Sequence, residues 1–167
     1  MGSTAEHLAA AFAGESQANR RYLAFSEKAE EEGYTMVARL FRAAAAAETI
    51  HAHNHLRAMH DVADTATNLD AAMEGEAEEF RRMYPDFVEV AKTEGDKEAA
   101  RTFDYAMQVE KIHYDLYGKA ASRVKEGNDL PYANVFVCRG CGNTEMDSVP
   151  DNCPICGAPK SWFMWIQ

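Results

Sequence analysis

A four-residue motif that occurs twice constrains this chain more than any other feature. Glu48-Thr-Ile-His51 is repeated 62 residues later as Glu110-Lys-Ile-His113. A glutamate and a histidine three positions apart on a helix project from the same face. Each pair can therefore bind one metal ion, and two such pairs indicate two ions.

The motif belongs to a larger internal repeat. Four more residues recur at the same offset of 62. These pairs are Gly33 and Gly95, Ala38 and Ala100, Arg39 and Arg101, and Phe41 and Phe103. Gly14-Glu15 instead matches Gly75-Glu76 at an offset of 61. The second half therefore holds one extra residue between Glu76 and Gly95, and we expect a helical bulge near Pro85. Glu79 aligns with Ala18, so the second half also has an acid that the first half lacks.

Hydrophobic periodicity predicts four long helices before the cysteines. Pro85 is expected to kink the third helix, and Gly33 and Gly95 to end the first and third. The third helix is expected to begin at an N-cap of Thr67 or Asn68. The expected ranges are residues 4–32, 34–61, about 67–95 and 96–125.

Two further acids, Glu15 and Glu76, lie on faces that are otherwise apolar. Glu15 taken alone has two interpretations, a half-exposed carboxylate at the edge of the face or a buried one compensated by a partner or a metal. One Glu from each of two helices and a Glu-x-x-His from each of the other two form the ligand set of ferritin-like di-iron bundles. Oxygen and imidazole donors suit iron or manganese. The expected ligands are Glu15, Glu48, His51, Glu76, Glu110 and His113.

Ordinary explanations compete with this interpretation. A single Glu-x-x-His is more simply explained as an exposed acid beside a packed histidine, but two copies inside a repeat favour a metal site. His53 and His60 are expected to be solvated, and His55 is a weaker ligand candidate than His51.

Composition limits the other possibilities. The chain has 167 residues, 47% of them hydrophobic, and a formal net charge of -10. Partners such as nucleic acid and anionic membranes usually require basic patches, so neither is expected. No apolar run approaches the roughly 20 residues of a spanning helix, and the first residues lack the features of a signal peptide. A cytoplasmic location is the default expectation.

All four cysteines fall near the end of the chain, in two pairs. The pairs are Cys138-Arg-Gly-Cys141 and Cys153-Pro-Ile-Cys156, and a glycine follows each. Two CxxC pairs of this kind place four thiolates tetrahedrally around one ion. The spacing predicts a metal site rather than disulfides, and it leaves the choice between Fe and Zn open. We call it the four-cysteine site.

With these motifs in place, nearly the whole chain resembles the rubrerythrin family. The phrases that carry the resemblance are residues 11–17 (AFAGESQ), 31–34 (EEGY), 47–51 (AETIH), 83–85 (MYP) and 153–160 (CPICGAPK). The resemblance implies an all-α, ferritin-like four-helix bundle over residues 1–130, followed by a rubredoxin-like domain over residues 131–167. The connection between the second and third helices is shorter than in the family.

The resemblance also implies roles for single residues. Glu48 and Glu110 are expected to bridge the irons of a non-haem di-iron centre, which is oxo-bridged when oxidised. Glu79 corresponds to a carboxylate that exchanges with the histidine at the position of His51. The catalytic residues implied are Glu79, His51, Tyr22 and Tyr84. The expected metal ligands are Glu15, Glu48, His51, Glu76, Glu79, Glu110, His113, Cys138, Cys141, Cys153 and Cys156.

The function that the resemblance implies is reduction of hydrogen peroxide to water, with electrons relayed by one Fe in the four-cysteine site. Zn is the alternative occupant of that site, and it would not relay electrons. The electrons are expected to come from NAD(P)H through a rubredoxin or a separate reductase. A homodimer or a higher oligomer is expected, in which one subunit's cysteine module lies near the other's di-iron site. The alternative is a ferroxidase or iron-handling protein that uses dioxygen. A helical scaffold with a structural zinc site is the third possibility.

Overall fold

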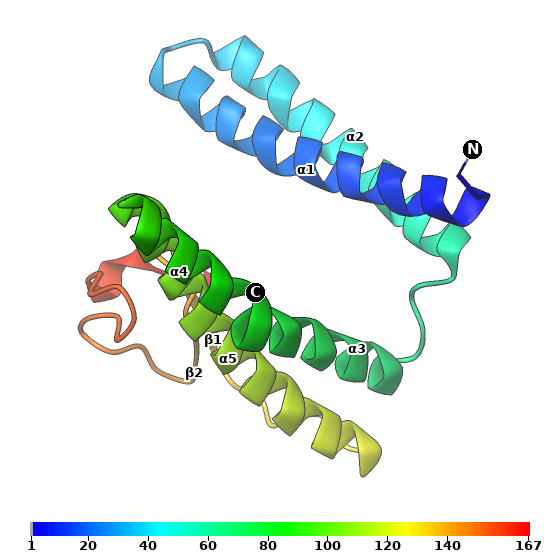
Figure 1. Cartoon of the computed structure of the whole chain (residues 1–167), viewed down its shortest axis with the longest axis vertical. Helices are drawn as coiled ribbons and strands as arrows, with labels where there is room; N and C mark the ends of the chain where they lie inside the picture. Colours follow the sequence, from blue (N-terminus) through cyan, green and yellow to red (C-terminus); the bar gives the residue numbers. More distant parts are fainter. Residues whose placement is uncertain (1) are drawn as a thin grey trace. The chain divides into compact units, whose positions relative to one another are not determined.

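The computed structural model describes residues 2–167, and its internal contacts divide the chain into two compact units, Met1–Ala63 and Asp64–Gln167. Four long helical segments precede a small sheet (Figure 1). The elements of the first unit are α1 (Thr4–Glu31) and α2 (Thr35–Met59). Those of the second are α3 (Thr65–Glu78), the π-helix η1 (Glu79–Met83), α4 (Tyr84–Glu94), α5 (Lys97–Lys125), β1 (Val135–Cys138), β2 (Thr144–Met146), the 3-10 helix η2 (Lys160–Trp162) and β3 (Phe163–Ile166).

The first unit is a helical hairpin whose ends are set by local sequence. The Ser3 hydroxyl accepts from the Glu6 amide, and the Glu6 carboxylate accepts from the Ser3 amide, which forms a capping box at the start of α1. Gly33 provides the predicted left-handed stop at φ 83°. The expected helices at 4–32 and 34–61 are therefore confirmed with ends shifted by one or two residues.

Small buried residues bring the two helices of the hairpin together. Ala38, Ala45 and Ala52 recur every seven residues along α2, and all three are buried. Residues seven apart on a helix share a face. Asn19 and Ser26 are buried in α1 at the same spacing. This narrow interface fixes the register between α1 and α2.

The third helical segment begins earlier than predicted and contains the predicted bulge. Its N-cap is Asp64, whose carboxylate accepts from the Thr67 amide at 2.9 Å, so the expected cap at Thr67 or Asn68 was wrong. An Asp at this position caps the helix with its own side chain. The extra residue lies in the π-helix Glu79–Met83, which ends two residues before Pro85. A π-turn holds one residue more than an α-turn, which explains the change of offset from 61 to 62.

Helix α5 is the element against which α3, η1 and α4 pack. Asp96 caps it by accepting from the amides of Glu98 and Ala99. In Figure 1, α3 and α4 run along α5. Val109 and Ala121 of α5 are buried, as are Val88 and Ala91 of α4.

The cysteine module is a three-stranded antiparallel sheet in the order β2-β1-β3. Strand β2 contacts α5 within the same unit. Cys138 lies at the end of β1 and pairs with Phe163 of β3. Cys138 is thus the last residue of a strand and Cys141 follows that strand, whereas Cys153 and Cys156 lie in the irregular segment before η2.

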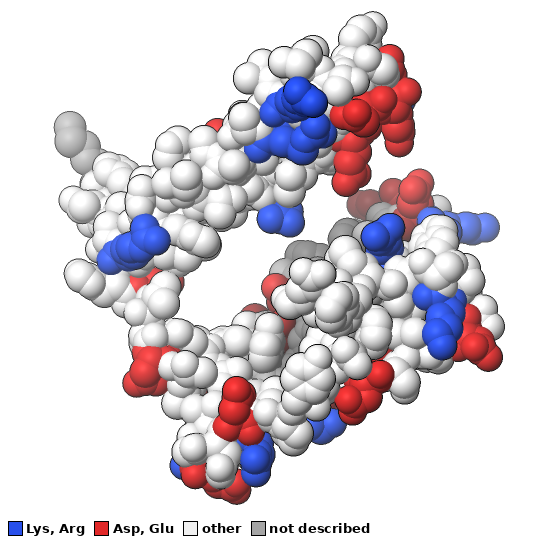
Figure 2. Space-filling view, turned by 180° about the vertical axis from the view of Figure 1, so that it is seen from behind, with Lys and Arg blue, Asp and Glu red and all other residues white. Residues whose placement is uncertain are grey.

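Within residues 2–167, no helix is long and apolar enough to cross a membrane. On the face seen in Figure 2, the coloured acidic and basic side chains lie among one another, and the basic ones do not join into one continuous patch.

Candidate metal centres

The first unit brings Glu15, Glu48 and His51 together. Nδ1 of His51 lies 2.9 Å from a Glu48 carboxylate oxygen and 3.9 Å from a Glu15 oxygen. One ligand atom from each residue lies within 4.8 Å of the others. The Glu15 side chain is 31% exposed. Of the two interpretations that the sequence allowed, the structure therefore agrees with the half-exposed carboxylate. His51 is more open, with 53% of its side chain exposed.

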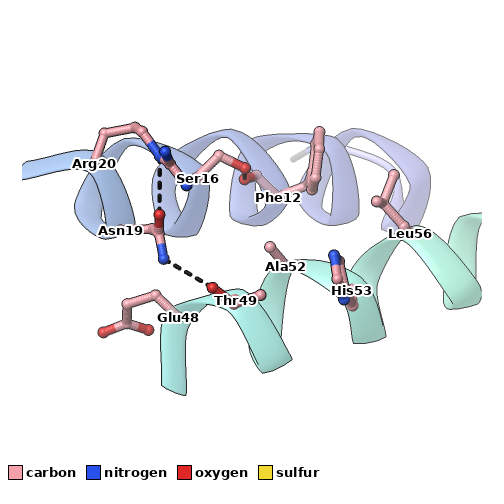
Figure 3. Close-up of a pocket in the computed structure, with 9 residues that line it drawn as sticks. All are labelled: Phe12, Ser16, Asn19, Arg20, Glu48, Thr49, Ala52, His53 and Leu56. Atoms are coloured by element: carbon pink, nitrogen blue, oxygen red, sulfur yellow. Dashed lines mark hydrogen bonds between the residues drawn. The ribbon is translucent and has the colours of Figure 1, made fainter. Parts of the chain in front are cut away.

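Asn19 holds the two helices of this triad in register. Its Nδ2 donates to the carbonyl oxygen of Ala45 at 2.7 Å and to the Thr49 hydroxyl at 2.8 Å. Figure 3 shows Asn19 reaching from α1 to Thr49, which directly follows Glu48 on α2. Arg20 donates to Oδ1 of Asn19 at 2.9 Å, so both ends of the buried amide are satisfied. This structural role was not predicted from the sequence.

The second unit brings Glu76, Glu110 and His113 together in the equivalent way. Nδ1 of His113 lies 2.8 Å from a Glu110 oxygen and 3.6 Å from a Glu76 oxygen. All three residues are half-buried. Burial and then the negative charge of Glu110 raise the pKa of Glu76 to about 7, against the opposing effect of His113. Burial and the charge of Glu79 also raise the pKa of Glu110.

Such raised pKa values are typical of carboxylates that are gathered without a compensating cation. Nitrogen–oxygen spacings of 2.8–3.9 Å also suit bonds of about 2.0–2.2 Å from one ion to nitrogen and oxygen. Both triads therefore fit a metal ion, and the six predicted bundle ligands fall into two sets of three, one in each unit.

Glu79 lies at the start of the π-helix. It is beside the second triad but is not one of the three residues whose ligand atoms lie within 4.8 Å of one another. Its charge helps to raise the pKa of Glu76, of Glu110 and of Tyr84. Burial is the largest cause of the raised pKa of Tyr84. Glu79 is thus close enough to act on the triad electrostatically.

Both predicted tyrosines lie in aromatic clusters that repeat at the offset of 62. Tyr84 contacts Phe87 and Phe103, with ring centroids 6.2 and 6.3 Å away. Tyr22 likewise lies 6.4 Å from Phe25 and 6.2 Å from Phe41. The match between Phe25 and Phe87 was missed in the sequence, although it has the same offset as the metal-binding motif. His53 and His60, as expected, are exposed, and His55 is in none of the clusters among the described residues.

The four cysteines meet in one cluster, with their sulfur atoms within 4.8 Å of one another. The Sγ atoms of Cys138 and Cys156 are 3.7 Å apart, and those of Cys141 and Cys153 are 3.6 Å apart. A disulfide would require about 2.05 Å. A tetrahedron with metal–sulfur bonds of about 2.3 Å has edges of about 3.8 Å. The cluster therefore fits one tetrahedral metal ion, as the spacing predicted.

Burial acts differently on the individual thiols. It raises the pKa of Cys138 and of Cys141. At Cys153 the effect of burial is outweighed by hydrogen bonds from the backbone amides of Cys156 and Ile155, which lower the pKa of the thiol. Since metal binding requires thiolates, these amides favour the bound state.

A hydrogen bond joins the cysteine module to the second triad. Nε2 of His113 lies 3.0 Å from the Thr144 hydroxyl oxygen on β2. The module thus contacts the triad of its own chain. Nothing in the sequence singled out Thr144, because the contact links a strand and a helix that are 31 residues apart.

Together, the helical Glu/Glu-x-x-His triads and the four-cysteine site define a class: a carboxylate di-iron protein with a rubredoxin-like site. The family model for rubrerythrin matches residues 6–121, and that for the rubredoxin-like domain of rubrerythrin matches residues 136–164. The chain belongs to the rubrerythrin family, whose members are oxidoreductases.

Individual relatives agree with this assignment. The chain is 40% identical to rubrerythrin-2 of Clostridium acetobutylicum, over 96% of this chain and 95% of that protein. It is 34% identical to nigerythrin of Nitratidesulfovibrio vulgaris, over 98% and 86% of the two chains. A solved structure of nigerythrin in a mixed-valence state aligns with a TM-score of 0.58 at 33% identity, over 99% of this chain and 88% of that one. The predicted fold class, a ferritin-like bundle with a rubredoxin-like domain, is confirmed.

Proposed function

We propose that this protein reduces hydrogen peroxide to water at a carboxylate di-iron centre, with electrons supplied through the four-cysteine site. The observation that carries the proposal is that the cysteine module lies against the helix that supplies Glu110 and His113. An electron-transfer site beside a di-iron ligand set is useful to a reductase. Iron storage requires no such site.

Peroxide needs two electrons and two protons to give two molecules of water, and iron would supply the electrons when it is bound. The side chains have the remaining tasks. The four triad carboxylates offset the charge of the two cations. Glu110 and Glu48 are the expected bridges.

Glu79 and Tyr84 are suited to delivering protons. Both lie beside the second triad, where burial and then negative charge raise the pKa of the tyrosine and so favour its protonated form. A group that retains its proton near a site where oxygen atoms become negatively charged can donate it there. Tyr22 is the equivalent group of the first repeat.

His51 is suited to act as the ligand that leaves. It is more exposed than His113, at 53% against 26%. Among the described residues its polar contacts are to Glu48 and Glu15 through Nδ1, whereas both nitrogens of His113 are engaged. Glu79 is the carboxylate proposed to replace His51 when the oxidation state changes.

The physiological reductant is proposed to be a rubredoxin or an NAD(P)H-dependent reductase, and the active form a homodimer or a higher oligomer. Neither assignment is needed for the first test, because chemical reduction replaces the donor.

The test is anaerobic reduction followed by rapid mixing with stoichiometric hydrogen peroxide. Absorbance of the ferric four-cysteine site then reports the return of electrons. We expect fast reoxidation in the wild type and a roughly 10- to 100-fold slower reaction in Glu79→Gln. Glu78→Gln is the matched control, since Glu78 is the adjacent exposed acid that pairs with Arg82.

Two outcomes would contradict the proposal. One is slow reoxidation by peroxide in the wild type. The other is faster reaction with dioxygen together with uptake of more iron than the di-iron and four-cysteine sites hold, which would favour iron handling.

A further inference from the structure

We propose that Thr144 is a positioning residue that fixes the tautomer of His113 and connects the four-cysteine site to the metal triad of its own chain. The inference rests on the proposed function for its electron-transfer part. Its structural part, the bond between Thr144 and His113, can be tested without any peroxide chemistry.

The two nitrogens of His113 have different surroundings. Nδ1 faces the Glu110 and Glu76 carboxylates, at 2.8 and 3.6 Å. Nε2 faces the Thr144 hydroxyl at 3.0 Å. A metal ion placed among the carboxylates would therefore be bound by Nδ1, which must then have a free lone pair.

The Thr144 hydroxyl selects the tautomer that leaves Nδ1 free. Its proton is directed to the carbonyl oxygen of Gly142, at 3.3 Å. Its oxygen is therefore available to accept a proton from a neighbour, and Nε2–H of His113 is that neighbour. A neutral imidazole with its proton on Nε2 presents the Nδ1 lone pair to the metal, as is usual for metal-binding histidines whose other nitrogen is hydrogen-bonded.

Thr144 also lies on a short path to the four-cysteine site. The amide N–H of Asn143 donates to the Cys141 sulfur. Asn143 is fully buried and is the residue before Thr144. From Cys141 the path thus crosses one hydrogen bond, the backbone from Asn143 to Thr144, and a second hydrogen bond to His113.

The buried backbone around Asn143 makes this path rigid. The Asn143 carbonyl accepts from the Cys138 amide at 2.9 Å, and the Gly142 amide donates to the Cys138 carbonyl at 2.8 Å. Thr144 pairs with Val137 in the sheet. The position of the hydroxyl is thereby set by the same backbone that holds the thiolates.

The electron-transfer step would change only the oxidation states of the two metal sites. One electron would pass from a metal ion held by the four cysteines to one held by the His113 triad, and no covalent bond would form or break. The route stays within one chain. It runs from the cysteine module to the His113 triad, and both lie in the same compact unit.

The decisive variant is Thr144→Val, which keeps the β-branched shape and removes the hydroxyl. Thr144→Ser restores the hydroxyl. Thr93→Val is the matched control, because the Thr93 hydroxyl bonds the Glu89 carbonyl on the exposed side of α4. The visible spectrum of the ferric four-cysteine site shows whether each variant has a folded module.

The first measurement uses protein loaded with zinc(II) at both kinds of site and observes imidazole N–H signals by NMR. We expect a His113 Nε2–H signal protected from exchange in the wild type, in Thr144→Ser and in Thr93→Val, and its loss in Thr144→Val. Persistence of the signal in Thr144→Val would overturn the assignment of the bond.

The second measurement is the reoxidation of fully reduced iron protein by stoichiometric peroxide. We expect Thr144→Val to slow the phase of the four-cysteine site by roughly 10- to 100-fold and Thr144→Ser to keep the wild-type rate. If that phase is unchanged in Thr144→Val, the route is wrong. If the wild type itself fails to react with peroxide, the proposed function fails, and the zinc(II) measurement still decides whether Thr144 positions His113.

Discussion

The π-helical turn at Glu79–Met83 leads to a prediction about deletions. The Tyr84 amide donates to the Glu79 carbonyl, five residues back, so this turn holds one residue more than an α-turn. Deleting Arg82 from it allows a regular helix that presents the same faces of α3 and α4 to α5. Pro85 must be replaced as well, and Leu is the choice because Leu23 occupies the equivalent position of the first repeat.

The structure sets the expected size of the effect. The Arg82 side chain is 77% exposed, and its ion pair with Glu78 is of the exposed i,i+4 kind, worth about 0.3–0.5 kcal/mol. A proline left inside a regular helix would cost about 3 kcal/mol, which the substitution Pro85→Leu avoids. The free energy of unfolding should therefore change by less than about 1 kcal/mol.

Deleting Arg21 is the matched control. Arg21 is also an exposed arginine within a long helix, but α1 has no π-turn. Loss of one residue there rotates one end of α1 by about 100° relative to the other. Asn19 and Ala29, both buried, can then no longer face α2 together. An unsatisfied Asn19 amide alone costs about 1–3 kcal/mol, and the lost packing adds to this.

The assay is urea denaturation of the metal-free proteins, followed by far-ultraviolet circular dichroism. We expect the Arg82 deletion with Pro85→Leu to keep the wild-type midpoint and the Arg21 deletion to lower it markedly. If both deletions lower the midpoint equally, the π-turn does not absorb the extra residue.

Two further predictions concern the individual sites. In the metal-free protein, the pKa of Glu76 is raised from 4.5 to about 7, so the folded state holds a proton that the unfolded chain has lost, and Tm should fall as pH rises through this interval. Glu76→Gln should flatten the profile of Tm against pH. If the variant has the same profile as the wild type, protonation of Glu76 is not the cause of the pH dependence. Gly140→Ala would place a Cβ atom 3.1 Å from the Cys156 sulfur and 3.3 Å from the Trp162 ring, and such crowding should weaken metal binding by roughly 10- to 100-fold in competition with a chelator. At Gly14 a Cβ atom would meet open space, so Gly14→Ala should instead stabilise α1 by about 0.5–1 kcal/mol. If the four-cysteine site has the same metal affinity in both variants, the crowding at Gly140 has no effect.

Local sequence was sufficient for those parts of the structure that depend on short-range physics. Helix ends followed from Gly33 and Gly95, and the cysteine cluster followed from the spacing of the two CxxC pairs. The bulge in the third helix was found by comparing offsets inside the repeat, which revealed a single inserted residue. The N-cap predicted for the third helix was wrong, because both Asp64 and Thr67 can cap a helix and only the geometry of the turn decides between them.

Contacts between distant segments could not be predicted in this way. The bond from Asn19 to Ala45 depends on how two helices pack, and the bond from His113 to Thr144 depends on where a strand meets a helix. Neither partner stands out by residue type or spacing. Each contact lies beside a triad, so some of the least predictable interactions are next to the candidate metal sites.

The repeat gives the two triads the same ligands, but their surroundings have diverged. Among the residues that the structure describes, the π-turn with its added acid lies in the second half, and of the two triad histidines only His113 has a hydrogen bond at Nε2. The same ligand types therefore have different freedom, since an exposed histidine held at one nitrogen can leave a metal more readily than one held at both. A storage site has no need of this difference. The proposed reductase would need it, because one of its metals would change ligands while electrons arrive through the other.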